Sequence, residues 1–224
     1  MLNSGFFCMD CMDGMRQFPD KFFELAIVDV PYGIGVDKMR LGNGKRVIHR
    51  GDWDAQPPSE RYFTELFRIS KNQIIWGANH FISQIPFNSP CWVFWDKGTG
   101  ENDYADGELA WTSFNSPVKK FFKSWVGANA KERVESDRIH ICQKPIELYK
   151  WLLTNYAHPG DKILDTHVGS ASSLIACHQL GFQYWGFELD ADYYKAASER
   201  LERAKAQVGL LDILPEGKPE QMRL

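Results

Sequence analysis

Short apolar runs alternate with helical patterns along most of the chain, and this alternation restricts the fold more than any other feature of the sequence. The apolar runs have the length and composition of strands and cover residues 6–8, 25–28, 73–76, 92–95, 139–142, 162–164 and 184–187. Apolar residues at helical spacing cover residues 59–70, 145–156, 172–180 and 191–206. This order is typical of an α/β protein with a mostly parallel central sheet and helices on both faces.

The length of the chain favours one domain, because 224 residues can bury one substantial core. We assign residues 1–211 to this domain, with loop excursions near 35–58 and 115–137, and the polar residues 212–224 to a flexible C-terminal tail. No stretch approaches the ~18 consecutive apolar residues of a membrane span, and the N-terminus lacks the pattern of a signal peptide. We therefore expect a cytoplasmic protein without a membrane partner.

Charge and cysteine content argue against two kinds of partner. A net charge of −3 does not suit a protein that coats nucleic acid through its overall charge, although basic clusters at 40–50 and 119–123 are candidates for local phosphate contacts. Cys8 and Cys11 have the C-x-x-C spacing of half a metal site, but the other three cysteines are isolated and supply no second pair. We therefore predict no metal.

The strand predicted at 25–28 stops at the segment Asp29-Val30-Pro31-Tyr32-Gly33. Parallel sheets present their ligand sites at the carboxyl ends of strands, and the proline and glycine turn the chain out of the sheet here. A carboxylate, a rigid turn and an aromatic ring at this place suit a flat base that carries an amino group. The same residues also fit an ordinary turn in which Asp29 caps a loop, so the segment alone leaves both interpretations open.

A second candidate site follows the strand predicted at 162–164. Gly169 permits a close approach of the backbone to a ligand, and serines at 170, 172 and 173 are candidates to cap the next helix. Glu188 ends the next strand nineteen residues after Gly169, a spacing that suits a ribose diol. A dinucleotide site, an S-adenosylmethionine site and a plain strand-to-helix turn all remain open, although the missing G-x-G-x-x-G pattern weakens the first. We expect Asp190 to cap the helix that begins near residue 191.

Taken together, these segments resemble the amino-group DNA methyltransferases, which modify exocyclic nitrogens of adenine or cytosine with S-adenosylmethionine. Residues 29–32 resemble the catalytic Asp-Pro-Pro-Tyr tetrad of that family, and residues 165–173 resemble its cofactor loop, Asp-Pro-Phe-x-Gly-Ser-Gly-Thr-Thr. Residues 140–145 resemble its His-Pro-Thr-Gln-Lys-Pro segment. With the tetrad first and the cofactor loop last, the order matches the permuted β class, which is similar to modification methylases of bacteria and their phages. The likeness covers about residues 6–204.

The resemblance implies a Rossmann-like methyltransferase fold and a role for each matching residue. The catalytic residues would be Asp29, Val30, Pro31 and Tyr32. The residues that bind S-adenosyl-L-methionine would be Asp10, Cys11, Lys144, Pro145, Asp165, Thr166, His167, Gly169, Ser170, Ser172, Glu188 and Leu189. Of these, Lys144 and Pro145 belong to the segment that closes over the methionine end of the cofactor. The family pattern further implies DNA with a flipped or single-stranded target base as partner. The segment available for target recognition, about residues 124–138, is short, which leaves three alternatives open: low specificity, recognition of DNA by the loop 35–58, or a contribution from a second copy of the chain, since members of the β class often pair.

The chain departs from the family pattern at several positions. Val30 replaces the first proline of the tetrad and keeps the backbone carbonyl that the family uses there, while it loses rigidity. Thr166, His167 and Ala171 replace the usual proline, phenylalanine and second glycine of the cofactor loop. Aspartate at the first tetrad position favours N6 of adenine, with N4 of cytosine as the alternative. A second alternative is a catalytically weak relative that binds the cofactor and DNA.

Overall fold

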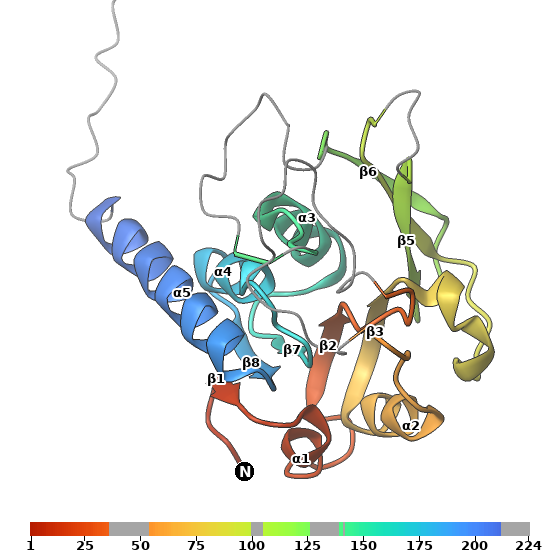
Figure 1. Cartoon of the computed structure of the whole chain (residues 1–224), viewed down its shortest axis with the longest axis horizontal. Helices are drawn as coiled ribbons and strands as arrows, with labels where there is room; N and C mark the ends of the chain where they lie inside the picture. The colour runs from red at the N-terminus through yellow and green to blue at the C-terminus, as the bar shows by residue number, and fades with distance from the viewer. Residues whose placement is uncertain (36–53, 100–104, 126–138, 141, 212–224) are drawn as a thin grey trace, which may run out of the picture.

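The computed structural model describes residues 1–35, 54–99, 105–125, 139, 140 and 142–211 (Figure 1). These residues form an α/β fold around an eight-stranded sheet, with strands in the order β1-β8-β7-β2-β3-β5-β4-β6. The strands are β1 (Gly5–Cys8), β2 (Phe23–Val28), β3 (Ser70–Trp76), β4 (Trp92–Asp96), β5 (Gly107–Thr112), β6 (Lys119–Phe122), β7 (Lys162–Asp165) and β8 (Gln183–Glu188). The α-helices are α1 (Cys11–Met15), α2 (Glu60–Ile69), α3 (Ile146–Tyr156), α4 (Ser172–Gln179) and α5 (Ala191–Leu211), and two short 3₁₀ turns are η3 (Ala78–His80) and η4 (Ile82–Gln84).

The sheet is mostly parallel, as predicted from the alternation. Strands β1, β8, β7, β2 and β3 pair side by side in parallel. Strand β5 runs antiparallel to both of its neighbours, β3 and β4, and β6 pairs in parallel with β4. The carboxyl ends of seven strands therefore lie at one edge of the sheet, where parallel sheets place their ligands.

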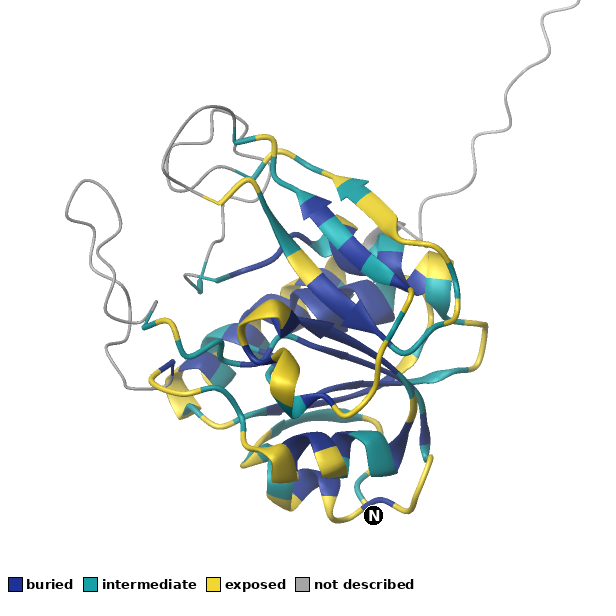
Figure 2. Cartoon of the chain, turned by 90° about the vertical axis from the view of Figure 1, so that its right-hand side faces the viewer, coloured by how far each residue is buried: buried dark blue, intermediate teal, exposed yellow. Residues whose placement is uncertain are grey.

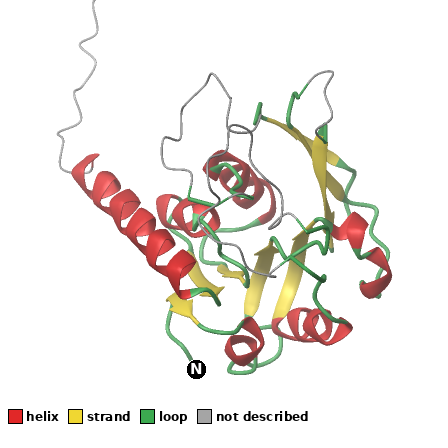
Figure 3. Cartoon of the chain, in the orientation of Figure 1, coloured by secondary structure: helices red, strands yellow, loops and turns green. Residues whose placement is uncertain are grey.

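Helices cover both faces of the sheet (Figures 1 and 3). Successive residues of β2 point to opposite faces, so Leu25 and Ile27 pack in the core under α3, α4 and α5, while Ala26 and Val28 pack in the core with α1 and α2. Figure 2 shows the strands in the middle of the sheet as mostly buried. A continuous apolar run is what a strand needs when both of its faces are covered.

Three details differ from the sequence predictions. The strand predicted at 139–142 is wrong, because Ile139, His140 and Cys142 lie in a turn. The Cys142 N–H donates to Nδ1 of His140 (3.1 Å), and the Gln143 N–H donates to its carbonyl (3.2 Å). Strands β5 and β6 and helix α1 were not predicted, and α5 continues to residue 211 instead of 206.

The predicted domain boundaries fall partly outside the described residues. Residues 36–53 and 126–138, which make up most of the two predicted excursions, lie outside them, as does the whole of 212–224. Residues 119–122 of the second excursion form β6. The assignment of 1–211 to one domain stays a prediction. In the part of the chain that is described, no helix is long and apolar enough to cross a membrane.

Candidate active site

The segment 29–33 leaves the carboxyl end of β2, and a buried carboxylate holds its turn. The Tyr32 and Gly33 N–H groups both donate to Oδ1 of Asp54, at 2.7 and 2.9 Å. Asp54 is 2% exposed, so water competes little for these bonds. Gly33 has φ +75° and lies so close to Pro57 that a Cβ there would come within 2.5 Å of the proline ring. The segment that precedes α2, through Asp54 and Pro57, therefore fixes the turn.

The ring of Tyr32 packs closely against the residues that follow the neighbouring strand, β3. Its ring stacks on His80, with ring centroids 5.2 Å apart and planes 17° from parallel. Gly77, which follows β3, makes room for the ring, because a Cβ at Gly77 would lie 2.0 Å from Cε1 of Tyr32. The hydroxyl group of Tyr32 is within reach of two acceptors, Asp29 Oδ1 at 2.8 Å and Glu108 Oε2 at 3.2 Å.

Two carboxylates and two lysines form one buried cluster around this hydroxyl group. Lys144 Nζ lies 2.6 Å from Asp29 Oδ1 and 2.9 Å from Glu108 Oε2, and Lys97 Nζ lies 2.5 Å from Glu108 Oε1. The side chain of Lys144 is only 3% exposed. Since two formal positive charges meet two negative ones, the cluster is neutral as a whole, which is how a buried group of charges avoids a large desolvation cost.

Position within the cluster sets the pKa of each group. Burial raises the pKa of Asp29, against the opposing pull of Lys144. Burial acts in the same direction on Glu108, but Lys144 and Lys97 together hold its pKa at about 2. Asp29 and Glu108 keep the pKa of Lys144 above its usual range despite burial. Asp29 is therefore the carboxylate of the pair that takes up a proton first.

A second group of acidic residues lies at the ends of β7 and β8. Asp165 Oδ1 accepts a hydrogen bond from the His167 N–H (3.0 Å), and Oδ2 accepts one from the Ser173 hydroxyl. Burial raises the pKa of Asp165 to about 7, and burial also raises that of Glu188. Glu188 Oε2 accepts from the Gly169 N–H (2.9 Å). Burial is the largest cause of both raised pKa values, so the hydrogen bonds to these carboxylates only partly offset the loss of hydration.

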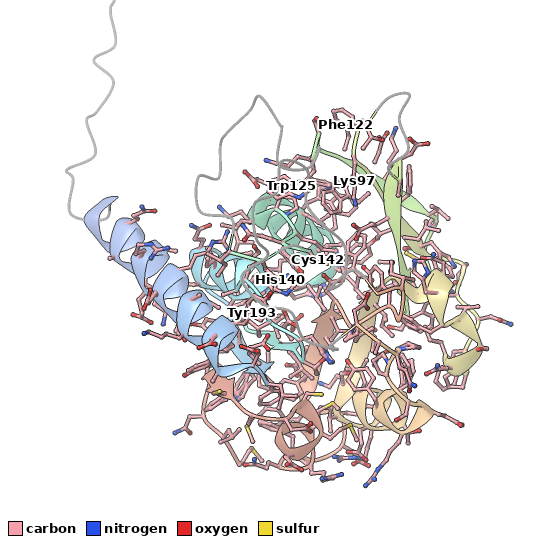
Figure 4. All side chains as sticks on the ribbon, viewed as in Figure 1. Lys97, Phe122, Trp125, His140, Cys142 and Tyr193 are labelled. Atoms are coloured by element: carbon pink, nitrogen blue, oxygen red, sulfur yellow. The ribbon has the colours of Figure 1, made fainter. Side chains whose placement is uncertain are left out.

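His140 lies beside this second group. The His140 ring is 4.5 Å from the ring of Tyr193 on α5, centroid to centroid, and a Cβ at Gly169 would lie 3.8 Å from His140. Figure 4 shows Tyr193, His140 and Cys142 one after another in the direction that leads from the start of α5 toward Lys97 and β6. The ends of β7 and β8, which carry Asp165 and Glu188, and the cluster around the Tyr32 hydroxyl group therefore face one continuous region of the molecule.

Comparison with known proteins identifies the family. The model of a DNA methylase family, N6/N4 methyltransferase, matches residues 93–199. The protein YubD of Escherichia coli, assigned as a methylase, is 33% identical over 210 residues, which cover 86% of this chain and 87% of YubD. The chain belongs to the N6/N4 DNA methylase family. The type II methyltransferase M.HpaI of Haemophilus parainfluenzae is 24% identical over 236 residues, or 87% of this methylase and 73% of the relative.

Solved structures share the fold of this methylase. A DNA modification methylase assigned in Thermus thermophilus, solved with S-adenosyl-L-methionine, has a TM-score of 0.57 at 19% identity and covers 90% of this chain and 94% of its own. PvuII DNA methyltransferase, described as cytosine-N4-specific, also has a TM-score of 0.57, at 11% identity and 93% coverage of both chains. The resemblance and the fold class inferred from the sequence are confirmed.

The methylase accommodates its departures from the family pattern without disrupting the cofactor loop. Ala171 adopts φ +63° at the N-cap of α4, a left-handed conformation that costs an alanine roughly 1–2 kcal/mol relative to glycine. No side chain caps α4, so the predicted serine cap is wrong. Arg200 of α5 instead donates to the Ser170 carbonyl (2.6 Å) and the Ser172 hydroxyl (3.0 Å), which ties these residues to a neighbouring helix.

Other predicted site residues lie around the same loop. Asp10 caps α1 by accepting from the Met12 N–H (2.7 Å), and burial raises the pKa of the Cys11 thiol to about 12. Burial lowers the pKa of His167 to about 4, so its ring is neutral at pH 7. Pro145 is buried and Leu189 is 70% exposed.

The predicted residues thus fall into two groups, one around the tetrad and one around the ends of β7 and β8. Lys144 lies in the tetrad group, although its motif indicated the cofactor group. Its Nζ contacts Asp29 and Tyr32 of the tetrad, although the sequence pattern assigned it to the cofactor. Glu108 and Asp54 complete the tetrad side and were not predicted, because neither belongs to a recognisable motif. Asp190 caps α5, as predicted, by accepting from the N–H groups of residues 192 and 193. Among the described residues, no group of three or more metal-ligating side chains is suited to hold a metal.

Proposed function

We propose that this methylase transfers a methyl group from S-adenosyl-L-methionine to the exocyclic N6 of adenine in DNA. The observation that carries the proposal is the position of the tetrad beside the acidic strand ends. Strand β2 pairs with β7, so Asp29 and Asp165 follow neighbouring strands, and the charge of Asp29 itself contributes to the raised pKa of Asp165. A base held at the tetrad would then lie next to a cofactor held at the cofactor loop.

The acidic group suits S-adenosyl-L-methionine, which carries a sulfonium and an ammonium cation. Burial raises the pKa of both Asp165 and Glu188, and a cation beside Asp165 would favour its ionised form. We propose that Glu188 and Leu189 face the ribose, that Asp10 and Cys11 flank the adenine ring, and that residues 165–170 with 172 surround the methionine part. We propose that Pro145 borders the methionine part, whereas the contacts of Lys144 with Asp29 and Tyr32 favour a role at the tetrad.

On this proposal, the tetrad orients the amine. An enzyme that acts on an exocyclic amine must flip the base from the stack or bind a single strand. Stacking on Tyr32 would stabilise the flipped base by roughly 1–3 kcal/mol. Asp29 and the carbonyl of Val30 would accept the two amine hydrogens, which turns the nitrogen lone pair toward the methyl group.

The cofactor supplies an electrophilic methyl group when it is bound. As the N–C bond forms and the S–C bond breaks, positive charge develops on the amine nitrogen, and Asp29 stabilises this charge. The amine would then give one proton to the Asp29 carboxylate that accepts its hydrogen bond, which leaves a neutral methylated base, and the cofactor would depart as a neutral thioether. The chain's own residues thus orient and stabilise and do not form a covalent link with the base.

The product of methylation tests the choice of base. Incubation with labelled S-adenosyl-L-methionine and unmethylated DNA, followed by mass spectrometry of the nucleosides, should yield N6-methyladenine. N4-methylcytosine as the sole product would overturn the adenine assignment and support the alternative. The fold does not discriminate, because the cytosine-specific PvuII methyltransferase shares it. Binding of the cofactor without transfer to any DNA would instead support a catalytically weak relative. A contribution from a second copy of the chain stays a prediction.

Substitution of Asp29 tests the mechanism. Asp29→Ala should lower the methyl transfer rate by about 100-fold or more, because it removes the group that orients and stabilises the amine. Binding of S-adenosyl-L-methionine, followed by calorimetry, should persist. The matched control is Asp20→Ala, since the Asp20 side chain is 77% exposed and its partner Arg68 lies on α2. Full activity of Asp29→Ala would contradict the mechanism.

A further inference from the structure

The groups that hold Asp29 in the free protein have a second acceptor in common. The Tyr32 hydroxyl is 2.8 Å from Asp29 Oδ1 and 3.2 Å from Glu108 Oε2. Lys144 Nζ is 2.6 Å from the same oxygen of Asp29 and 2.9 Å from the same oxygen of Glu108. Each donor thus already lies within hydrogen-bond distance of both carboxylates, and it keeps one acceptor when the other turns away.

This sharing matters because the amine of a target base needs the oxygens of Asp29. In the free protein, one oxygen of Asp29 contacts both donors. A buried lysine that lost its carboxylate partner would be costly, and the base would have to meet that cost on entry. Glu108 removes the difficulty, since it keeps both the lysine and the tyrosine paired when Asp29 turns to the amine.

Two lysines keep the Glu108 carboxylate ionised, which this role requires. Lys97 holds its other oxygen, Oε1, at 2.5 Å, so Glu108 keeps one cation of its own while it receives the second. Lys144 is restrained between aromatic rings as well, with Nζ 5.4 Å from the Trp76 ring centroid and 5.6 Å from that of Tyr32. The lysine therefore has little freedom other than the exchange between the two carboxylates.

We infer that Glu108 is a positioning residue that accepts Lys144 and the Tyr32 hydroxyl when Asp29 binds the amine of the base. The inference rests on the proposed function, since it assigns the amine to Asp29. Glu108 acts through its two neighbours and does not itself touch the base. The titratable groups that face Asp29 are Tyr32, Glu108, Cys142, Lys144, Tyr149 and Asp165.

The test compares Glu108→Gln with Glu24→Gln. Glu24 is the matched control, because its side chain is also 22% exposed and also contacts two lysines, Lys71 at 3.0 Å and Lys162 at 3.1 Å. Glu24 is near the start of β2, at the far end of the strand from Asp29. Both variants lose one carboxylate charge between two lysines, so a general effect on folding should appear in both.

Kinetics on a DNA that the wild type methylates should separate the two variants. Glu108→Gln should lower the single-turnover rate of methyl transfer by about 10- to 100-fold, the loss that a charged hydrogen bond commonly causes, while KM for the cofactor changes little. The acid limb of the pH–rate profile should also move to lower pH, because removal of the Glu108 charge lowers the pKa of Asp29. A rate and a profile equal to those of Glu24→Gln would overturn the inference.

A measurement without DNA distinguishes failure of this inference from failure of the proposed function. Carboxyl ¹³C NMR of the free protein should show a lower pKa for Asp29 in Glu108→Gln than in the wild type, and an unchanged pKa would overturn the inference. If Glu108→Gln does not fold, Lys97→Gln replaces it, and the pKa of Glu108 should rise in that variant. An unchanged Glu108 pKa would again overturn the inference. An inactive wild type would contradict the proposed function alone.

Discussion

Substitution of Gly77 by alanine tests how closely Tyr32 is seated. A Cβ at this position would lie 2.0 Å from Cε1 and 2.3 Å from Cδ1 of the Tyr32 ring. Carbon atoms in contact need about 3.5 Å, so the ring would have to withdraw by about 1.5 Å. The stacked ring of His80 lies against Tyr32, with centroids 5.2 Å apart, and limits that movement.

The expected loss of stability has two parts. Gly77 has φ +70°, and alanine in this region costs roughly 1–2 kcal/mol. Overpacking of a filled site costs roughly 1–3 kcal/mol more. Gly181→Ala is the matched control, since Gly181 has φ +76° and nothing lies within 4 Å of its Cβ position. The control should lose only the backbone part, so the difference between the variants isolates the contact with Tyr32.

Urea unfolding of the two variants measures this difference, which should be about 1–3 kcal/mol. Gly77→Ala should also transfer methyl groups more slowly than the control, because a displaced ring carries its hydroxyl away from Asp29. Equal unfolding free energies and equal transfer rates in the two variants would refute the proposed seat of Tyr32.

Two further predictions concern buried carboxylates. Asp54→Asn keeps the size of the side chain but replaces its charged hydrogen bonds to the Tyr32 and Gly33 N–H groups with neutral ones. The variant should lose about 1–3 kcal/mol of unfolding free energy and transfer methyl groups more slowly, while its affinity for the cofactor, measured by calorimetry, stays the same. An unchanged transfer rate would show that the turn does not need this carboxylate. The pKa of Asp165 is about 7 in the folded protein against about 3.9 unfolded, so its contribution to stability is full below about pH 4 and is lost as the pH rises through about 7. In Asp165→Asn, the urea concentration at the unfolding midpoint should therefore depend less on pH across this range than in the wild type. Parallel pH profiles of wild type and variant would contradict the raised pKa.

The secondary structure was predictable where the amino-acid pattern is set by burial on both sides. The run 25–28 is apolar throughout because β2 packs against helices on each face. Strand β6 escaped prediction because it begins with Lys119-Lys120, and lysines on an edge strand are hard to tell from a solvated loop. Strand β5 escaped because Glu108, a charged residue near its start, interrupts the pattern of an apolar strand.

The turn at 139–142 shows the opposite error. Ile139 and Cys142 give the segment an apolar character, yet the imidazole of His140 accepts the Cys142 N–H and closes a turn. Local hydrogen bonds from side chain to backbone compete with sheet pairing, and their geometry is not visible in a hydrophobic pattern.

The tetrad was predictable because its residues are adjacent in the sequence, while its supports were not. Asp54 is 22 residues from Tyr32 and Glu108 is 76 residues from it, and each contacts the tetrad only through the tertiary fold. Lys144 was found by its motif, but the motif carried no information on the direction of its side chain. Sequence similarity therefore indicated candidate residues of the site, and it carried no information on the contacts between them.

The two groups differ in how their charges are balanced. The tetrad cluster is neutral as a whole, whereas no lysine or arginine among the described residues forms an ion pair with Asp165 or Glu188, and burial raises the pKa of both. Because the charge of Asp29 raises the pKa of Asp165, the two carboxylates interact, and this interaction is reciprocal. A cationic cofactor beside Asp165 favours the ionised form of Asp165 and offsets the charge that this carboxylate then places beside Asp29. We therefore expect Asp165 to be ionised when the methyl donor is in place, whereas the tetrad cluster needs no cofactor cation for its balance.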